Sequence, residues 1–345
     1  MNWNEYGSFI VEETKNLLAI DSPSGMTKKA AEHVMARFGA LGYAPQMTRK
    51  DGVLVSLGGR DEANGLLLEA HMDTLGGMVC QIKTNGRLKI TPIGGLRAEN
   101  VETENCRVVT KFDGVIEGTA QLINASTHVN EKYADTQRTF DTIEIVLDEP
   151  AESAEDVKKL GIRTGDYVCF EPRTRVTESG YIKSRFLDDK LSVGILLGYA
   201  KYLKDEHITP ERAVYVHITS FEEVGHGGSA SVPAGVTEAI SVDMGCVGEG
   251  LTCDERMVSI CAKDSGGPYN YDVVRGLIAA AEKMGAPYAV DVYPRYGSDV
   301  EATLRAGYDI RHGLIGSGVY ASHGYERSHI EGALATLKTL AGYVK

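Results

Sequence analysis

The stretch Gly65-Leu66-Leu67-Leu68-Glu69-Ala70-His71-Met72-Asp73 joins an apolar run to two side chains that can carry chemistry. Its three consecutive leucines are typical of a strand that is buried on both faces of a sheet. His71 and Asp73 come directly after this strand, and residues two apart on an extended segment point to the same side. Because open α/β sheets bind ligands beyond the carboxyl ends of their strands, this ending is a candidate site.

The chemistry of the pair depends on how the two side chains meet. The Asp73 carboxylate can accept a proton from the His71 ring, which leaves the other ring nitrogen free to bind a metal ion. A purely structural role for the pair is the alternative interpretation.

The segments that follow residue 177 alternate between strands and helices. We expect helices at 189–204, 270–284 and 330–343 and strands at 213–220 and 239–243. This alternation predicts an α/β sandwich around a mixed, mainly parallel sheet.

The segment 82–176 has a different texture, with short alternating strands punctuated by glycine. We interpret it as a small inserted β-barrel domain. Residues 1–81 and 177–345 then form the two parts of one catalytic domain.

Acidic residues mark two turns after the expected barrel. Asp188 and Asp189 precede an apolar helix, and a cation would compensate their repulsion, although an N-cap is the alternative. Glu222 and Glu223 follow the strand at 213–220. One of these carboxylates could bind metal while the other accepts a proton from a water, and a solvated turn is the alternative.

Two further positions complete the candidate set. Asp243 ends the strand at 239–243, where an ordinary turn residue is the alternative. Near the C-terminus, either His323 or His329 could be a ligand, and His226 stays open because it adjoins the glutamate pair. Imidazoles and carboxylates together suit two borderline divalent ions such as zinc or cobalt.

Composition excludes several classes of partner. The formal net charge of −12 argues against nucleic acid, because phosphate binding needs clustered Lys and Arg. The six cysteines contain no C-x-x-C pair, and no stretch approaches the roughly 20 apolar residues of a membrane span. With no signal-peptide pattern at the N-terminus, we expect a cytoplasmic protein that does not insert into membranes.

Five motifs occur in a fixed order along the chain. They are HMD (71–73), LDD (187–189), EEVG (222–225), VDMG (242–245) and SHGYE (322–326). This series resembles the M42 family of metallopeptidases, the group of tetrahedral and glutamyl aminopeptidases. The resemblance covers nearly the whole chain and implies a zinc-exopeptidase-like sandwich.

The resemblance also implies a site with two divalent ions, zinc or cobalt. One ion would lie between His71, Asp188 and Asp243, and the other between Glu223, Asp188 and His323. Asp73 would belong to the catalytic machinery, and the peptide bond between Asp188 and Asp189 would be cis.

The implied reaction is the removal of N-terminal residues from short peptides. Glu222 would act as the general base on a water held between the two ions and return the proton to the leaving amine. A related di-metal carboxypeptidase or deacylase, and an inactive peptide-binding scaffold, are the rival interpretations.

The resemblance makes two further points. Similar proteins form homo-oligomers, including dodecamers, through the inserted barrel. The C-terminal motif departs from the family pattern, because Glu326 follows His323 by three positions where the acidic residue usually follows by four. His323 is the preferred ligand because it lies nearest the tyrosine and the acidic residue of the motif, and His329 is the competing choice.

Overall fold

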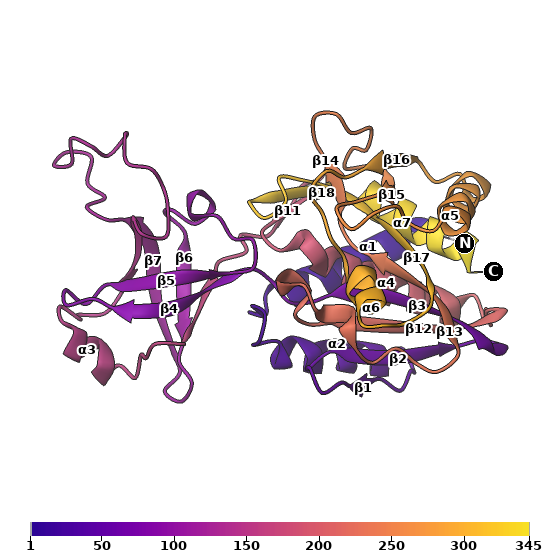
Figure 1. The fold of residues 1–345 in the computed structure, drawn as a ribbon, viewed down its shortest axis with the longest axis horizontal. Helices are drawn as coiled ribbons and strands as arrows, with labels where there is room; N and C mark the ends of the chain where they lie inside the picture. Colours follow the sequence, from indigo (N-terminus) through magenta and orange to yellow (C-terminus); the bar gives the residue numbers. More distant parts are fainter. Residues whose placement is uncertain (1, 345) are drawn as a thin grey trace. The chain divides into compact units, whose positions relative to one another are not determined.

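The computed structural model describes residues 2–344, and contacts divide the chain into two compact units. The larger unit comprises the chain up to Thr74 and from Arg173 onward, and the smaller unit is Leu75–Pro172. Figure 1 shows both units with their helices and strands labelled.

The larger unit is built on a twelve-stranded mixed sheet. Its main path, in spatial order, is β1 (Gln46–Met47), β2 (Val53–Gly58), β12 (Arg212–Thr219), β3 (Asp61–His71), β13 (Val236–Val242), β17 (Arg311–Tyr320), β18 (Glu326–His329), β11 (Tyr181–Ser184) and β10 (Arg175–Val176). Off this path lie β14 (Gly245–Val247), β15 (Val258–Lys263) and β16 (Tyr288–Val292).

The four central strands, β12, β3, β13 and β17, are parallel to one another. Thr219 pairs with His71 across β12 and β3, while Ser241 pairs with Glu69 across β13 and β3. This register brings the carboxyl ends of the central strands to one edge of the sheet, whereas the pairs β1–β2, β17–β18 and β10–β11 are antiparallel.

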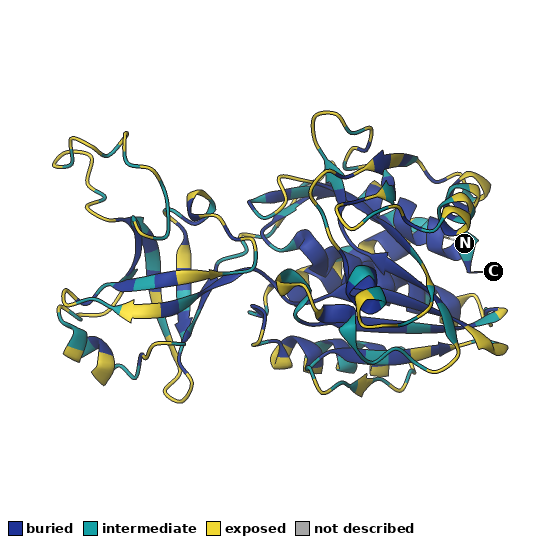
Figure 2. Cartoon of the chain, in the orientation of Figure 1, coloured by how far each residue is buried: buried dark blue, intermediate teal, exposed yellow. Residues whose placement is uncertain are grey.

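Alternation along β3 separates two hydrophobic cores. Leu66 and Leu68 pack in the large core with the helices, whereas Leu67 packs in a second core that includes Val300. The large core is covered by α1 (Trp3–Leu18), α2 (Lys28–Ala40), α4 (Leu187–Asp205), α5 (Tyr271–Met284) and α7 (Ile330–Tyr343). Figure 2 shows the central strands as almost continuously buried.

The opposite face of the sheet carries polar side chains as well as the second core. The short helix α6 (Asp299–Arg305) covers it, together with the 3-10 turn η3 (Gly227–Ser229). Glu69, His217 and Ser241 belong to the same face as Leu67 by strand alternation, and all of them are buried. The sheet therefore has an apolar face under the long helices and a partly polar face under α6.

The smaller unit is a closed six-stranded barrel. Around the barrel the strands are β4 (Gly76–Ile82), β5 (Leu88–Ile93), β8 (Ile143–Leu147), β7 (Val115–Leu122), β6 (Asn105–Val109) and β9 (Tyr167–Phe170). The unit also contains α3 (Ala154–Lys159) and the 3-10 turn η1 (Ala98–Asn100). Alternate residues such as Val108, Ala120 and Ile145 are fully buried and fill its interior.

The inserted barrel was expected at residues 82–176, and its compact unit is Leu75–Pro172. β4 begins at Gly76, before the expected start of the barrel, but pairs with the barrel strands β5 and β9. β10 lies before residue 177 but pairs with β11 of the large sheet. Glycines at the start of β4 weaken the alternation that would have revealed it.

The mixed α/β fold with an inserted barrel is confirmed. The helices expected at 189–204, 270–284 and 330–343 correspond to α4, α5 and α7. Asn270 caps α5 by accepting hydrogen bonds from two main-chain N–H groups, and Gly285 ends it in the left-handed conformation. Among residues 2–344, no helix is long and apolar enough to cross a membrane.

Candidate metal centre

The candidate ligands come from five places that the fold brings to one edge of the sheet. His71 is the last residue of β3, Asp243 directly follows β13, and Glu223 lies in the 3-10 turn η2 (Glu222–Val224) after β12. Asp188 lies at the start of α4, and His323 follows β17. The parallel register of the central strands accounts for the first three meeting.

Five of these side chains form two groups that could each hold a metal ion. The groups are His71, Asp188 and Asp243, and Asp188, Glu223 and His323. Within each group, the potential ligand atoms all lie within 4.8 Å of one another. The two groups share Asp188.

Asp188 faces the two histidines with different oxygens. Its Oδ1 lies 3.1 Å from Nε2 of His71, and its Oδ2 lies 3.5 Å from Nε2 of His323. A carboxylate with one oxygen turned to each group has the geometry of a bridge between two cations.

Glu222 and Glu223 are adjacent in sequence but turn to different groups. Oε2 of Glu222 lies 3.6 Å from Nε2 of His71, and Oε2 of Glu223 lies 3.6 Å from Nε2 of His323. Glu222 is in neither ligand group among the described residues, and its carboxylate lies beside the centre, where it could accept a proton.

The acidic groups perturb one another strongly. Burial and the nearby Asp188 raise the pKa of Asp243 to about 7, and burial followed by neighbouring carboxylates raises the pKa of Glu223. Burial opposes ionisation of Asp188, yet hydrogen bonds from His323 and His71 hold its pKa below the usual range. Burial lowers the pKa of His323, but the hydrogen bond to Asp188 and the surrounding carboxylate charges together raise it to about 10. Crowded carboxylates of this kind are stabilised by a bound cation.

Asp73 does not meet His71 in the predicted way. Nδ1 of His71 lies 2.9 Å from the main-chain oxygen of Asp73 and 3.6 Å from its carboxylate. The carboxylate instead accepts hydrogen bonds from the main-chain N–H groups of Glu222 and Glu223, at 3.1 and 3.4 Å, and from the Ser24 hydroxyl at 2.5 Å. Its closest partners are therefore the turn that carries the glutamates and the N-terminal segment.

Glu326 connects the two ends of the centre. Its carboxylate accepts hydrogen bonds from the main-chain N–H groups of Asp188, at 3.1 Å, and His323, at 3.0 Å. Burial and the charge of Asp188 raise the pKa of Glu326 to about 8. The peptide bond between Asp188 and Asp189 is cis, as the family resemblance implies.

His329 is in neither group. It caps α7, because Nδ1 accepts a hydrogen bond from the Glu331 N–H at 3.1 Å, while Nε2 lies 2.7 Å from the main-chain oxygen of Ser179. Both ring nitrogens are thus engaged with the main chain, and the geometry favours His323 as the candidate ligand.

The candidate ligand His323 and two phenylalanines that precede candidate residues have left-handed backbone conformations that L side chains rarely adopt. Phe186, Phe221 and His323 have φ values of 68°, 69° and 62°. Each such conformation costs about 1–3 kcal/mol and persists where the surrounding structure enforces it, which is typical of functional sites.

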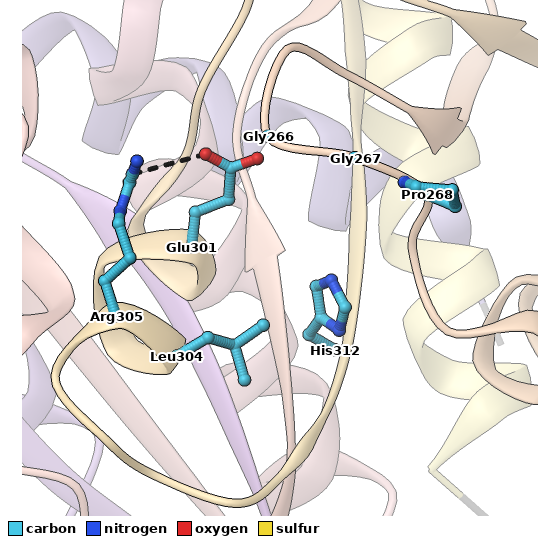
Figure 3. A pocket seen from close by; sticks show the side chains of 7 residues that line it. All are labelled: Gly266, Gly267, Pro268, Glu301, Leu304, Arg305 and His312. Atoms are coloured by element: carbon cyan, nitrogen blue, oxygen red, sulfur yellow. Dashed lines mark hydrogen bonds and ion pairs between the residues drawn. The ribbon is translucent and has the colours of Figure 1, made fainter.

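A separate hollow of about 170 Å³ lies beside α6. Figure 3 shows Glu301 and Arg305, joined by an ion pair of 3.2 Å, together with Leu304 and His312 among the residues that line the hollow. None of the candidate ligands lines it.

Sequence reasoning gave no role to several residues that hold the centre in place. Ser24 contacts Asp73, Glu326 contacts two ligand-bearing segments, and Tyr296 donates a hydrogen bond to the main-chain oxygen of Met244. Glu326 lies in the SHGYE motif, and Ser24 lies in the stretch Pro23-Ser24-Gly25, which also resembles the family, so a signal was available for both. Tyr296 had none.

Comparison with known proteins points to one family. A model of the M42 glutamyl aminopeptidase family matches residues 51–339. YhfE, a putative aminopeptidase of Bacillus subtilis (strain 168), is 41% identical over 335 residues, which cover 97% of each chain. The glutamyl aminopeptidase of Lactococcus lactis subsp. cremoris is 26% identical over 226 residues, covering 64% of this chain and 61% of that enzyme.

Solved structures share the fold. The aminopeptidase APDkam598 of Desulfurococcus kamchatkensis has a TM-score of 0.87 at 21% identity, covering 98% of this chain and 95% of that one. The TET1 peptidase of Pyrococcus horikoshii, described as assembling into a tetrahedron or a large octahedral shell, has a TM-score of 0.84 at 23% identity, covering 97% and 99%.

Proposed function

This chain belongs to the M42 glutamyl aminopeptidase family and is a peptide-bond hydrolase, and from that premise we propose that it is a di-metal aminopeptidase of short peptides. The observation that carries the proposal is the pair of ligand groups that share Asp188, with the carboxylate of Glu222 beside them.

The donor set fits two divalent ions. Each group offers one imidazole and two carboxylates, a combination that suits zinc or cobalt better than magnesium, which prefers oxygen ligands. Bound ions supply Lewis acidity to the scissile carbonyl and lower the pKa of the attacking water.

The side chains divide the remaining work. Glu222 accepts a proton from the attacking water and returns it to the amine that leaves. Asp73 keeps Glu222 and Glu223 in place through their main-chain N–H groups. A cluster of buried carboxylates also favours the ammonium of a free N-terminus, which accounts for cleavage at that end of a peptide.

The substrate assignment is tested with a panel of compounds and two metals. Protein treated with EDTA is reloaded with zinc or cobalt, and hydrolysis of amino-acid p-nitroanilides and short peptides is compared with hydrolysis of N-acylated amino acids. We expect two ions per chain and activity only on free N-termini. Preferential cleavage of acylated substrates would replace the aminopeptidase with a deacylase, and no hydrolysis by the two-ion protein would leave a binding scaffold.

We also infer that the chain forms a homo-oligomer of up to twelve copies, which assemble through the barrel. Support comes from a structural relative whose structure is described as a dodecamer, PhTET1-12s, at 23% identity and a TM-score of 0.83. Light scattering coupled to size-exclusion chromatography measures the mass directly, and a stable monomer would contradict this inference.

We place the enzyme in the cytoplasm. All six cysteines are free, which agrees with a reducing compartment where disulfides are rare. Fractionation of cells followed by immunodetection tests the location, and recovery outside the cytoplasmic fraction would contradict it.

A further inference from the structure

Tyr296 lies in the loop that joins β16 to α6, and this loop is anchored independently of the metal centre. The Tyr296 N–H donates to the Ser265 hydroxyl at 3.0 Å, and the Ser265 N–H donates to the Tyr296 main-chain oxygen at 3.1 Å. The Tyr296 ring packs against Tyr293, with ring centroids 5.0 Å apart. The position of the phenol is therefore set by contacts with Ser265 and Tyr293, neither of which is a candidate metal ligand.

The hydroxyl of Tyr296 reaches the segment that carries Asp243. Its single proton is donated to the main-chain oxygen of Met244, the residue directly after Asp243, at 2.9 Å, and the Asp243 carboxylate is the alternative acceptor of that proton. The Asp243 carboxylate accepts a hydrogen bond from the Met244 N–H at 2.6 Å, and the Asp243 N–H donates to the main-chain oxygen of Ile315 at 3.0 Å.

We propose that Tyr296 is a positioning residue that orients the Asp243 carboxylate toward the ion held with His71 and Asp188. This inference rests on the proposed two-ion function. Ligating carboxylates are commonly fixed by hydrogen bonds from residues that do not touch the metal, and these partners tune metal affinity.

The effect is confined to one of the two ligand groups. Tyr296 contacts the segment of Asp243, which belongs only to the group with His71 and Asp188. In the other group, His323 has its main chain held by Glu326. Removal of the Tyr296 hydroxyl therefore weakens binding of one ion and spares the other.

The test removes a single oxygen atom with Tyr296→Phe and compares it with Tyr293→Phe. Tyr293 lies in the same loop and is a matched control, because its hydroxyl lies 2.5 Å from the Ser259 hydroxyl. Each change is made in two backgrounds, His323→Ala and Asp243→Ala. The first background leaves the ion group that contains Asp243, and the second leaves the group that contains His323.

Calorimetric titration of the metal-free proteins with zinc gives one affinity per background. In the His323→Ala background, we expect Tyr296→Phe to lower zinc affinity by about 10- to 100-fold, the usual effect of removing such a partner. In the Asp243→Ala background, we expect Tyr296→Phe to leave the zinc affinity within twofold of the value for that background alone. Tyr293→Phe should likewise leave the zinc affinity within twofold in both backgrounds. Thermal midpoints of the metal-free proteins report whether the fold is retained.

Three results would overturn the inference. They are an unchanged affinity with Tyr296→Phe in the His323→Ala background, an equal loss in both backgrounds, and an equal loss with Tyr293→Phe. If the wild-type protein binds fewer than two zinc ions, the two-ion function fails and takes this inference with it. If it binds two and Tyr296→Phe has no effect, only the role of Tyr296 is rejected.

Discussion

Two clusters of acidic side chains lie beside the central sheet, and they differ in the groups that their carboxylates contact. The metal centre sets carboxylates against imidazoles and against one another, as in the contact of Asp188 with His71 and His323. A second cluster, which we call the α6 cluster, consists of Glu69, Asp299, His217, Thr219 and Thr303.

Neutral donors satisfy the carboxylates of the α6 cluster. Asp299 accepts hydrogen bonds from the Thr219 hydroxyl and the Gly228 N–H, each at 2.5 Å. The Thr303 hydroxyl lies 3.1 Å from Glu69 Oε2. Carboxylates supplied with hydroxyl and amide donors are already satisfied by the protein, whereas several carboxylates that crowd around the same two imidazoles would be stabilised by a cation.

The same substitution in each cluster gives the largest contrast. Asp188→Asn removes charge from both ligand groups, so we expect both ions to bind far more weakly and peptidase activity to fall below detection. Asp299→Asn should lower the stability of the metal-loaded protein by about 1–3 kcal/mol, because the Thr219 hydroxyl and the Gly228 N–H lose a carboxyl oxygen as acceptor, while both ions still bind. Metal analysis and thermal unfolding measure the two effects, and equal metal loss in both variants would erase the distinction.

The general base can be separated from the ligands by an isosteric change. Glu222→Gln cannot accept a proton, so kcat should fall by about 10²- to 10⁴-fold while two ions stay bound. Glu69→Gln is the matched control from the α6 cluster, and its kcat should stay within a few-fold of the wild-type value. Steady-state kinetics at saturating zinc give both numbers, and loss of metal from Glu222→Gln would make Glu222 a ligand instead.

Glu326 tests how far the centre depends on main-chain support. In Glu326→Gln, one carboxylate oxygen is replaced by an amide NH₂, which cannot accept the hydrogen bond from the N–H of Asp188 or His323. One of these two segments then loses its support, so zinc affinity should fall by about 10- to 100-fold. Glu331→Gln is the control, because the Glu331 side chain is 57% exposed. Competition with a chromophoric chelator measures the affinity, and identical values for the two variants would reduce Glu326 to a packing role.

The smallest effect concerns pH. Burial raises the pKa of Glu69 from 4.5 to about 8. A raised pKa means that the folded state holds a proton that the unfolded state releases, so this contribution to stability is complete below pH 4.5 and is lost as pH rises through 8. Glu69→Gln should therefore gain thermal stability relative to wild type between pH 6 and 9, and a constant difference across that range would contradict the assignment.

The sequence was sufficient to predict that the candidate residues at strand ends meet at one edge of the sheet. His71, Glu223 and Asp243 follow apolar strands, and parallel strands bring such ends together whatever the detailed packing. The same logic located the sandwich and the inserted barrel, because alternation and helix spacing are local properties.

The rest of the site depends on contacts between distant segments. Nothing near Tyr296 in sequence indicates that its hydroxyl reaches Met244, and nothing near Asp73 indicates that its carboxylate holds the Glu222 turn. The choice between His323 and His329 was open for a related reason: a histidine that caps a helix and a histidine that faces a carboxylate look alike until the turn geometry is known.

The topology of β3 has a consequence for synthesis on the ribosome. Its two neighbours in the sheet, β12 and β13, begin only at Arg212 and Val236. The barrel lies between β3 and β12 in the sequence, and it is complete by Pro172. At about 5–20 residues per second, β3 waits on the order of ten seconds for its first partner. During that interval the nascent chain carries a finished barrel and an unpaired apolar strand, which makes the leucine-rich segment a natural binding site for chaperones.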